Sequence, residues 1–373
     1  MITSKHVLYA GGYASADQAG IHGCIFDDAT GDLTVRGSFA GIVNPSFLSV
    51  HPNGRWLYAV SETSQQKDGT PGAVWAFRCT DEPWSMEPIN HQMSGGDWPC
   101  HLDINSTGQW LLVSNYGSGT VSVLPILPDG ALGEITDLIQ HYGSGPKSER
   151  QEGPHVHSAT FTPDQRFVMV ADLGIDTLVV YAFDSSAGRL REPIRTSTRP
   201  GAGPRFKIFH PSGQRVYVDN ELDNTVAVYD YDAESGRLRE LQIVETLPPD
   251  APESTVAGIQ ISPSGDRLYV SNRGHDSISI FEIEADGRLT RLAIRPCGGR
   301  CPRDIAISPS GHFLLVANQD SDEVVVLPVL DGVEALGAPV SRIIALGASC
   351  VHFVKDTWRP QGTPLHFSLS NQD

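Results

Sequence analysis

A block of about a dozen residues recurs six times along the 373-residue chain, and this recurrence restricts the possible folds more than any other feature. Measured at the turn near the start of each block, successive copies are 46 to 57 residues apart, a length that suits one four-stranded blade of a β-propeller. A seventh, shorter copy, HVLYAGGY, begins at His6. The six full copies are HPNGRWLYAVSE from His51, NSTGQWLLVSNY from Asn105, TPDQRFVMVADL from Thr162, HPSGQRVYVDNE from His210, SPSGDRLYVSNR from Ser262 and SPSGHFLLVANQ from Ser308.

Each copy follows the plan of a blade. An alternating strand precedes the turn, a second strand follows it, and two further strands complete the unit. The later strands are rich in β-branched and aromatic residues, as a pleated surface favours, and examples are expected at 120–124, 178–183, 225–231 and 277–283.

The two ends of the chain complement each other. The first blade lacks an innermost strand, whereas residues 348–354, ASCVHFV, resemble the inner strand NPSFLSV and have no blade after them. We therefore expect this C-terminal strand to complete the first blade and remove exposed sheet edges. The sequence predicts an all-β protein, a closed seven-bladed β-propeller, with residues 1–356 as one domain and residues 357–373 as a surface tail.

Composition narrows the classes of function. The chain has 27 basic and 44 acidic residues, a formal charge of −17, which argues against nucleic acid or an anionic membrane as a partner. The polar start MITSKH shows neither a secretory signal nor a membrane span, so a cytoplasmic location is expected. The six scattered cysteines contain no CxxC pair and are expected to be free thiols. GxSxG, GxxxxGKS and strand-to-helix GxGxxG motifs are absent, which disfavours serine-nucleophile and nucleotide chemistry.

Two positions of the repeat vary in a way that indicates chemistry, because repeats share what the scaffold needs and differ where a single site needs one residue type. A tight turn joins the first two strands antiparallel, so the start of the first and the end of the second lie on the same rim. The starts of the inner strands hold Ser46, Cys100, His157, Arg205, Ala257 and Arg303. The ends of the second strands hold Tyr13, Glu62, Tyr116, Leu173, Glu221, Arg273 and Gln319.

The charged members of these positions are expected to meet on one face of the ring; they are His157, Arg205, Glu221, Arg273 and Arg303. Three arginines near one axis require carboxylates or an anionic ligand to compensate them. A structural alternative pairs them with Glu62, Glu221 and Asp304. The favoured interpretation is anion binding and stabilisation of an oxyanion.

Several neighbouring residues offer alternatives. His155 and His157 share a strand face and would suit a metal, but no third ligand stands at a convincing spacing, so no metal site is predicted. Cys100 is an alternative nucleophile without an identifiable base. His275, in the segment NRGHD, is a second-rank substrate-binding candidate. A recurrent Asn or Asp is assigned to turn capping because it recurs, at Asn115, Asp172, Asn220, Asn272 and Asn318.

Four segments together resemble a known family. GPHVHSATF, GPRFKIFHPSGQRVYVDNELDNTVAVYDY, SNRGHDSISIF and CPRDIAISPSGHFLLVANQ are similar to the lactonase family of seven-bladed propellers, which includes 6-phosphogluconolactonases and carboxymuconate cyclases. The resemblance spans nearly the whole chain. It implies cleavage or closure of a sugar-acid or muconate lactone by an arginine, histidine and glutamate cluster, carried here by His157, Arg205, Glu221 and Arg273.

The leading hypothesis is hydrolysis of a δ-lactone such as 6-phosphogluconolactone, a small anionic substrate, without metal or organic cofactor. His157 would activate water, with Glu221 orienting it or replacing it as base, while Arg205 and Arg273 hold the oxyanion. Arg303 would help to bind the phosphate, and the other substrate-binding candidates are Gln319, Glu62, Tyr116 and His275. Two alternatives stay open, a muconate-type cycloisomerase and a non-catalytic binding propeller. The sequence leaves the oligomeric state open.

Overall fold

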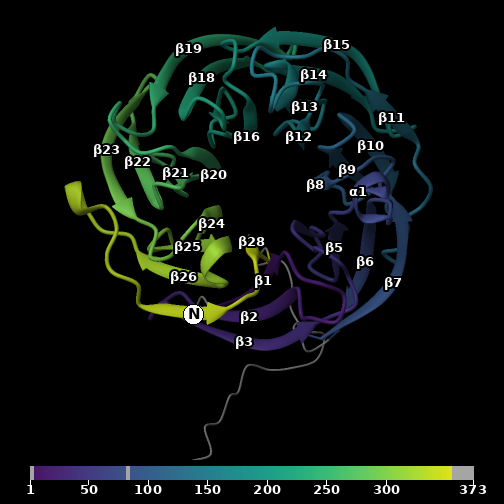
Figure 1. The fold of residues 1–373 in the computed structure, drawn as a ribbon, viewed down its shortest axis with the longest axis horizontal. Coiled ribbons are helices and arrows are strands. Elements are labelled where there is room, and N and C mark those ends of the chain that lie inside the picture. The colour runs from purple at the N-terminus through teal and green to yellow at the C-terminus, as the bar shows by residue number, and fades with distance from the viewer. Residues whose placement is uncertain (1–3, 81–84, 355–373) are drawn as a thin grey trace, which may run out of the picture.

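Seven four-stranded sheets form a ring in the computed structural model, which describes residues 4–80 and 85–354 (Figure 1). All sheet pairings are antiparallel, and each blade runs from an inner strand near the axis to an outer strand at the circumference. The prediction of an all-β, seven-bladed propeller is confirmed. The predicted tail at 357–373 lies outside the described residues.

The blades, from innermost to outermost strand, are β28 (Ala348–Phe353), β1 (Lys5–Gly12), β2 (Ile21–Asp27) and β3 (Asp32–Phe39); β4 (Leu48–Val50), β5 (Trp56–Ser61), β6 (Ala73–Cys79) and β7 (Met86–Met93); β8 (Pro99–Ile104), β9 (Trp110–Asn115), β10 (Thr120–Pro125) and β11 (Asp137–Gln140); β12 (Val156–Phe161), β13 (Phe167–Asp172), β14 (Thr177–Asp184) and β15 (Arg189–Ser197); β16 (Pro204–Phe209), β17 (Arg215–Asn220), β18 (Thr225–Asp232) and β19 (Arg237–Glu245); β20 (Thr255–Ile261), β21 (Arg267–Arg273), β22 (Ser277–Ile283) and β23 (Leu289–Pro296); β24 (Pro302–Ile307), β25 (Phe313–Asn318), β26 (Glu323–Pro328) and β27 (Ser341–Ile344). The described helical turns are α1 (Gln65–Asp68), η1 (Leu173–Ile175), η2 (Gln319–Ser321) and η3 (Gly332–Glu334).

The C-terminal strand β28 closes the ring by pairing with β1. Tyr9 is opposite His352 and Ala10 is opposite Val351, and the backbone N–H of Val354 donates to the carbonyl of Val7 at 2.9 Å. The first blade thus takes its inner strand from one end of the chain and its other three strands from the opposite end. This confirms the predicted closure.

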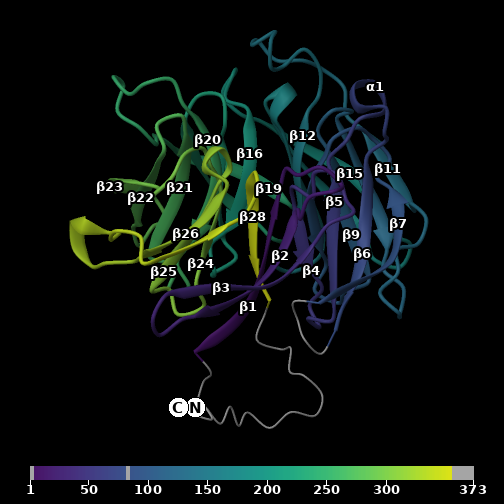
Figure 2. The ribbon, with the colours of Figure 1, turned by 60° about the horizontal axis from the view of Figure 1, so that its bottom comes forward.

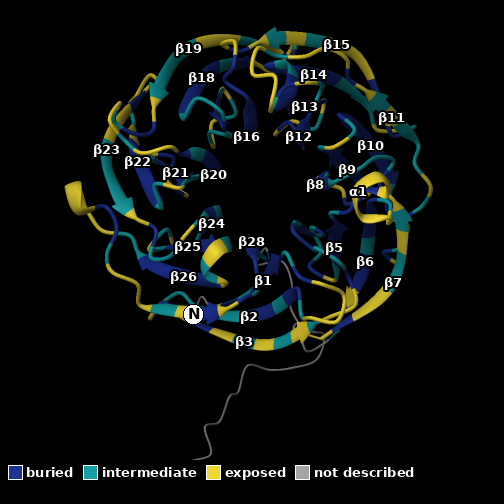
Figure 3. Ribbon diagram, viewed as in Figure 1, coloured by how far each residue is buried: buried dark blue, intermediate teal, exposed yellow. Residues whose placement is uncertain are grey.

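Apolar side chains between neighbouring blades make up the core. Leu112 of β9 and Val121 of β10 pack in one cluster with Val170 of β13, so this cluster joins two adjacent blades. The strands near the middle of each blade are buried on both faces, whereas the outer strands alternate between buried and exposed residues, as Figure 3 shows. Each fully buried Val or Leu contributes about 1.5–3 kcal/mol relative to an exposed one. Stability therefore depends on every blade having two neighbours.

In three blades, an aspartate in the hairpin between the second and third strands contacts the chain that leads to the next blade. Asp176, Asp276 and Asp322 adopt left-handed backbone conformations, with φ of 49°, 56° and 53°, which Asp tolerates better than most residues. The Asp176 carboxylate accepts from the N–H of Gly201 at 2.6 Å, and that of Asp276 accepts from the N–H of Cys301 at 2.8 Å. These contacts, called latches below, set the position at which the next inner strand begins.

Asn115, Asn220 and Asn272 bond within their own hairpins, as capping requires, whereas the side-chain bond of Asn318 is to the Cys297 carbonyl at 3.5 Å. Asn220 donates from Nδ2 to Thr225 Oγ1 at 2.9 Å, and Asn272 donates from Nδ2 to Ser277 Oγ at 3.1 Å. All six cysteines are free thiols, as expected. Among the described residues, no helix has both the length and the apolar character required to cross a membrane.

Removal of β28 tests the closure. A chain that ends at Gly347 leaves β1 as an unpaired inner edge, and we expect it to aggregate and to lack a cooperative thermal transition. A control chain that ends at residue 356 keeps β28 and should unfold at the same temperature as the full chain. The measurements are size-exclusion chromatography and differential scanning calorimetry. A monodisperse short chain with an unchanged transition would contradict a stabilising role for the closure.

Candidate active site

Arg205 and Glu221 lie side by side because their blade folds its first two strands into an antiparallel pair. Pro204 at the start of β16 is paired with Asn220 at the end of β17. Arg205 and Glu221 are the residues that follow these two. The Nε of Arg205 is 3.1 Å from Oε2 of Glu221, and both side chains are almost fully buried. The two repeat positions singled out in the sequence therefore meet on one face of the ring.

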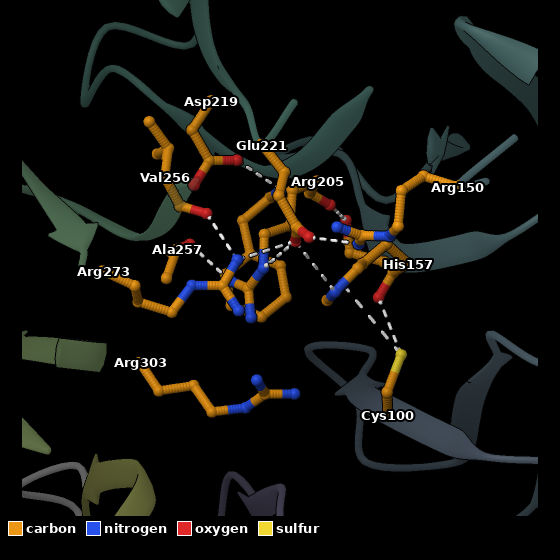
Figure 4. A network of polar contacts seen from close by, with 12 residues as sticks. Cys100, Arg150, His157, Arg205, Asp219, Glu221, Val256, Ala257, Arg273 and Arg303 are labelled. Carbon is orange, nitrogen blue, oxygen red and sulfur yellow. Dashed lines mark hydrogen bonds and ion pairs between the residues drawn. The ribbon is translucent and has the colours of Figure 1, made fainter. Parts of the chain in front are cut away.

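Glu221 is surrounded by positive charge, as Figure 4 shows. Its Oε2 lies 3.0 Å from an Nη of Arg273 on the next blade, and its Oε1 lies 2.5 Å from an Nη of Arg150. Burial alone would raise the pKa of the Glu221 carboxyl, but Arg273 and Arg205 outweigh burial and hold this pKa well below its usual range. Glu221 is therefore ionised at neutral pH.

His157 faces the same carboxylate from the preceding blade. Its Nε2 lies 3.9 Å from Oε2 of Glu221, and its buried ring meets the Phe206 ring edge-on with centroids 5.3 Å apart. Burial, followed by the charge of Arg205, lowers the pKa of His157 well below its ordinary value, although Glu221 opposes the shift. The imidazole is therefore neutral at neutral pH, with a lone pair free to accept a proton.

A second polar group lies around Glu62. Tyr13 donates to Oε2 of Glu62 at 2.8 Å, Ser46 also donates to this oxygen, and an Nη of Arg303 donates to the Tyr13 hydroxyl at 2.7 Å. Burial raises the pKa of the Glu62 carboxyl, and the charge of Arg303 opposes this. Figure 4 shows the Arg303 guanidinium directed toward the space between Arg273 and Cys100.

The other predicted residues differ in how closely they join this group. Tyr116 stacks on His155 with centroids 4.4 Å apart and faces His157 edge-on at 5.6 Å, so it belongs to the site. Gln319 is the first residue of η2, and its Oε1 lies 4.0 Å from Sγ of Cys301. Cys301 precedes Arg303 by two residues, so Gln319 lies beside the chain that leads to Arg303. The hydrogen bond of His275 is to Ser277 Oγ in its own hairpin, at 2.8 Å.

The alternatives to a histidine base gain no support. His155 uses Nδ1 for the Tyr116 carbonyl at 3.0 Å and places Nε2 3.3 Å from Glu152. Across residues 4–80 and 85–354, no three His, Cys, Asp or Glu side chains gather as a metal site would require. Cys100 lies 4.0 Å from Nδ1 of His157, but burial raises the pKa of its thiol, which disfavours the thiolate needed for attack.

Arg150 was missed in the sequence because it lies outside the repeats. It stands in the connection between β11 and β12, residues 141–155, which is longer than the corresponding connection of any other blade, so Arg150 aligns with no column of equivalent residues. No motif marks it either. Only the folded loop brings this guanidinium to Glu221.

Lys207 was also missed, although the repeats contain a signal for it. Its Nζ donates to Ser158 Oγ at 2.7 Å, and Ser158 Oγ donates to the Arg205 carbonyl at 2.6 Å, so Lys207 supports the backbone of a site residue. Burial lowers the pKa of Lys207 to about 7, against the opposing charges of Asp103 and Asp219. The equivalent residues of the other blades are all apolar: Leu48, Leu102, Ala159, Ile259, Ile305 and Val351.

Comparison with known proteins gives a consistent result. The family model described as "Lactonase, 7-bladed beta-propeller" matches residues 7–353. A 6-phosphogluconolactonase of Bacillus subtilis is 34% identical over 325 residues, which cover 87% of this chain and 91% of that protein. A 6-phosphogluconolactonase of Formosa agariphila is also 34% identical, over 82% of this chain and 87% of its own length.

Solved structures agree over almost the whole chain. The periplasmic gluconolactonase of Pseudomonas aeruginosa superimposes with a TM-score of 0.87 at 31% identity, covering 94% of this chain and 99% of that one. A protein from Lactobacillus plantarum superimposes with a TM-score of 0.86, also at 31% identity, over 94% of this chain and all of the other.

The charge balance around Glu221 predicts a pH-dependent contribution to stability. Because the folded pKa lies below the ordinary value of 4.5, ionised Glu221 stabilises the fold above about pH 4.5, and this contribution is lost as pH falls toward the folded pKa. We expect Glu221→Gln to lower the free energy of unfolding by about 3 kcal/mol at pH 7, because it leaves buried arginines uncompensated. The deficit should shrink below pH 4.5.

Urea unfolding of both proteins at several pH values between 3.5 and 7 measures this deficit. Glu87→Gln, at an exposed position of β7, is the matched control and should show no deficit at any pH. A Glu221→Gln deficit that stays constant across the range would contradict the depressed pKa.

Proposed function

The chain belongs to the lactonase family of seven-bladed β-propellers, and on this premise we propose that it hydrolyses a sugar-acid lactone, 6-phosphogluconolactone. The relatives that carry the name 6-phosphogluconolactonase support hydrolysis over the muconate-type cyclisation. A cytoplasmic location and the absence of nucleic acid as a partner stay predictions from the sequence.

The observation that carries the proposal is the local excess of positive charge around a single ionised carboxylate. Three arginines, Arg150, Arg205 and Arg273, contact Glu221, and Arg303 adds a fourth cation nearby. The chain as a whole carries a formal charge of −17, so this concentration runs against the overall field. Such an arrangement suits a small anion and an oxyanion formed during reaction.

In the proposed mechanism, neutral His157 accepts a proton from water as the water oxygen attacks the lactone carbonyl carbon. The imidazolium that forms is stabilised by Glu221, whose carboxylate oxygen lies 3.9 Å from Nε2. The arginines that lower the pKa of the resting imidazole make it a weaker base, and Glu221 offsets part of this as the positive charge develops. Glu221 therefore positions the base and stabilises it.

Arg205 and Arg273 are the proposed oxyanion donors. The buried Nε of Arg273 has no hydrogen-bond partner among the described residues, so it is available to a developing negative charge. The tetrahedral intermediate collapses by breaking the ring C–O bond, and His157 returns its proton to the leaving alkoxide. The products are a hydroxyl group and a carboxylic acid, which ionises and releases one proton to solvent. A lactone is an activated ester, so the proposed reaction needs no cofactor.

The remaining residues are proposed to bind the substrate. Arg303, held by Tyr13, supplies a further cation for anionic groups, and Glu62 fixes Tyr13 in turn. Tyr116 and Gln319 supply neutral hydrogen-bonding groups. His275 is a weaker candidate, because its ring is bonded within its own hairpin.

Substitution of the base and of one oxyanion donor tests the proposal. The purified chain should open 6-phosphogluconolactone faster than the spontaneous background, with His157→Ala lowering kcat by about 10²–10⁴-fold. Arg273→Ala should lower it by about 10²–10³-fold. The measurement is proton release at constant pH.

The exposed variants His312→Ala and Arg239→Ala serve as controls and should retain full activity. The same proteins are assayed with carboxymuconate lactone. Full lactonase activity in both site variants would refute this site, and turnover of the muconate lactone alone would favour the cycloisomerase.

Chelation tests the cofactor-free mechanism. Since base catalysis and arginine donors account for each step, incubation with EDTA followed by dialysis should leave kcat within twofold of its starting value. The untreated enzyme dialysed in parallel is the control. Activity that disappears and returns with a divalent cation would contradict the mechanism.

A further inference from the structure

The loop between β11 and β12 is built to hold one arginine at the edge of the site. At its start, His141 places Nδ1 2.7 Å from Oδ2 of Asp172, and at its end the N–H of His155 donates to Oδ1 of the same residue at 2.8 Å. Both His141 and Asp172 are fully buried, and Nε2 of His141 lies 2.9 Å from the Tyr181 hydroxyl. One buried carboxylate therefore fixes both ends of the loop.

The residue after Arg150 fixes the tip of the loop. Gln151 is fully buried and donates to the Leu173 carbonyl at 2.8 Å and to the latch carboxylate of Asp176 at 2.7 Å. Its Oε1 accepts from the N–H of Lys147 at 3.1 Å, and the N–H of Arg150 donates to the Lys147 carbonyl at 2.9 Å. The backbone of Arg150 is thus preorganised, which lowers the entropic cost of binding. In Figure 2 this teal loop rises above the ring before β12.

The Arg150 side chain differs from the other arginines that contact Glu221 in two ways: it is more exposed to solvent, and Glu221 is already paired with two other arginines. Its side chain is 42% exposed, whereas that of Arg205 is 3% exposed and that of Arg273 is 14% exposed. Glu221 already has Arg205 and Arg273 on Oε2, so the third guanidinium, on Oε1, exceeds what one carboxylate requires. The exposed part of its guanidinium is therefore accessible to an anionic ligand that enters from solvent, while its other contacts are to Glu221 and Tyr116.

We propose that Arg150 forms a subsite for a phosphate monoester and selects phosphorylated lactones over unphosphorylated ones. This inference rests on the proposed lactonase function. The reacting carbonyl lies with the buried His157, Arg205 and Arg273, and the phosphate at the far end of the sugar acid meets the half-exposed guanidinium. Arginine suits this role because its planar fork matches the geometry of phosphate oxygens. An Nη of each arginine is already bonded, that of Arg150 to Glu221 and that of Arg303 to Tyr13, and Arg150 is preferred because its side chain is 42% exposed.

The test compares two substrates that differ only in the phosphate, 6-phosphogluconolactone and gluconolactone. For the wild-type chain we expect kcat/KM to favour the phosphorylated lactone by more than tenfold. Arg150→Gln should raise KM for the phosphorylated lactone by about 10–100-fold, the range for loss of a charge-assisted hydrogen bond. Its KM for gluconolactone should change less than twofold, and any change in kcat that follows from the lost contact with Glu221 should be the same for both substrates.

Two further variants separate charge from structure. Arg150→Lys keeps the positive charge and should recover part of the selectivity, and Glu149→Gln, at the exposed neighbouring position of the loop, should leave it unchanged. The melting temperature of each variant is measured alongside. Competitive inhibition of wild type by 6-phosphogluconate, stronger than that by gluconate, provides a readout independent of variant folding.

Each outcome bears on one of the two proposals. Wild-type hydrolysis of both lactones without preference, or equal losses on both in Arg150→Gln together with a lowered melting temperature, overturns the subsite and leaves the lactonase proposal intact. Failure of the wild-type chain to hydrolyse either lactone overturns the proposed function, and the subsite with it. A KM effect confined to the phosphorylated lactone supports both.

Discussion

The pairing of β28 with β1 is the contact on which the rest of the structure depends. Each blade buries apolar residues against both neighbours, so an open ring would expose the faces of two blades as well as an inner strand edge. Val351 of β28 belongs to the cluster that includes Leu8 of β1 and Leu315 of β25. The closing strand therefore completes a sheet and also seals the interface between the first blade and the last.

The latches between neighbouring blades determine where the charged residues begin. The latch of Asp276 on the N–H of Cys301 fixes the chain two residues before Arg303, and the latch of Asp176 on Gly201 and Gly203 fixes it just before Arg205. Because the backbone before each arginine is already fixed, its long cationic side chain would lose less conformational freedom when an anion binds. Glu221 then makes their burial tolerable, since uncompensated buried guanidinium groups would be costly.

Much of this architecture could be predicted from the sequence because a repeat reports the same strand several times. Alternation in six copies determined the strands, and departures from the repeat indicated Arg205, Glu221, Arg273 and His157, which the structure brings together. Lys207 could have been predicted in the same way, because every other blade has an apolar residue at the equivalent position. Arg150 could not be predicted in this way, because its loop is longer than the corresponding loops and offers no equivalent positions to compare. The position of the loop also depends on buried partners of Gln151 that are distant in sequence, Asp176 and Leu173.

The ring also has a topological consequence. Because the last inner strand is antiparallel to the first strand of the chain, and Val354 bonds to Val7, the two ends of the described propeller meet within a single blade. A short linker between them would make the backbone circular, and the chain could then be reopened in a loop between any two blades. Such permuted chains would retain the cluster of His157, Arg205, Glu221 and Arg273, because these residues come from three blades and meet whatever their order along the polypeptide.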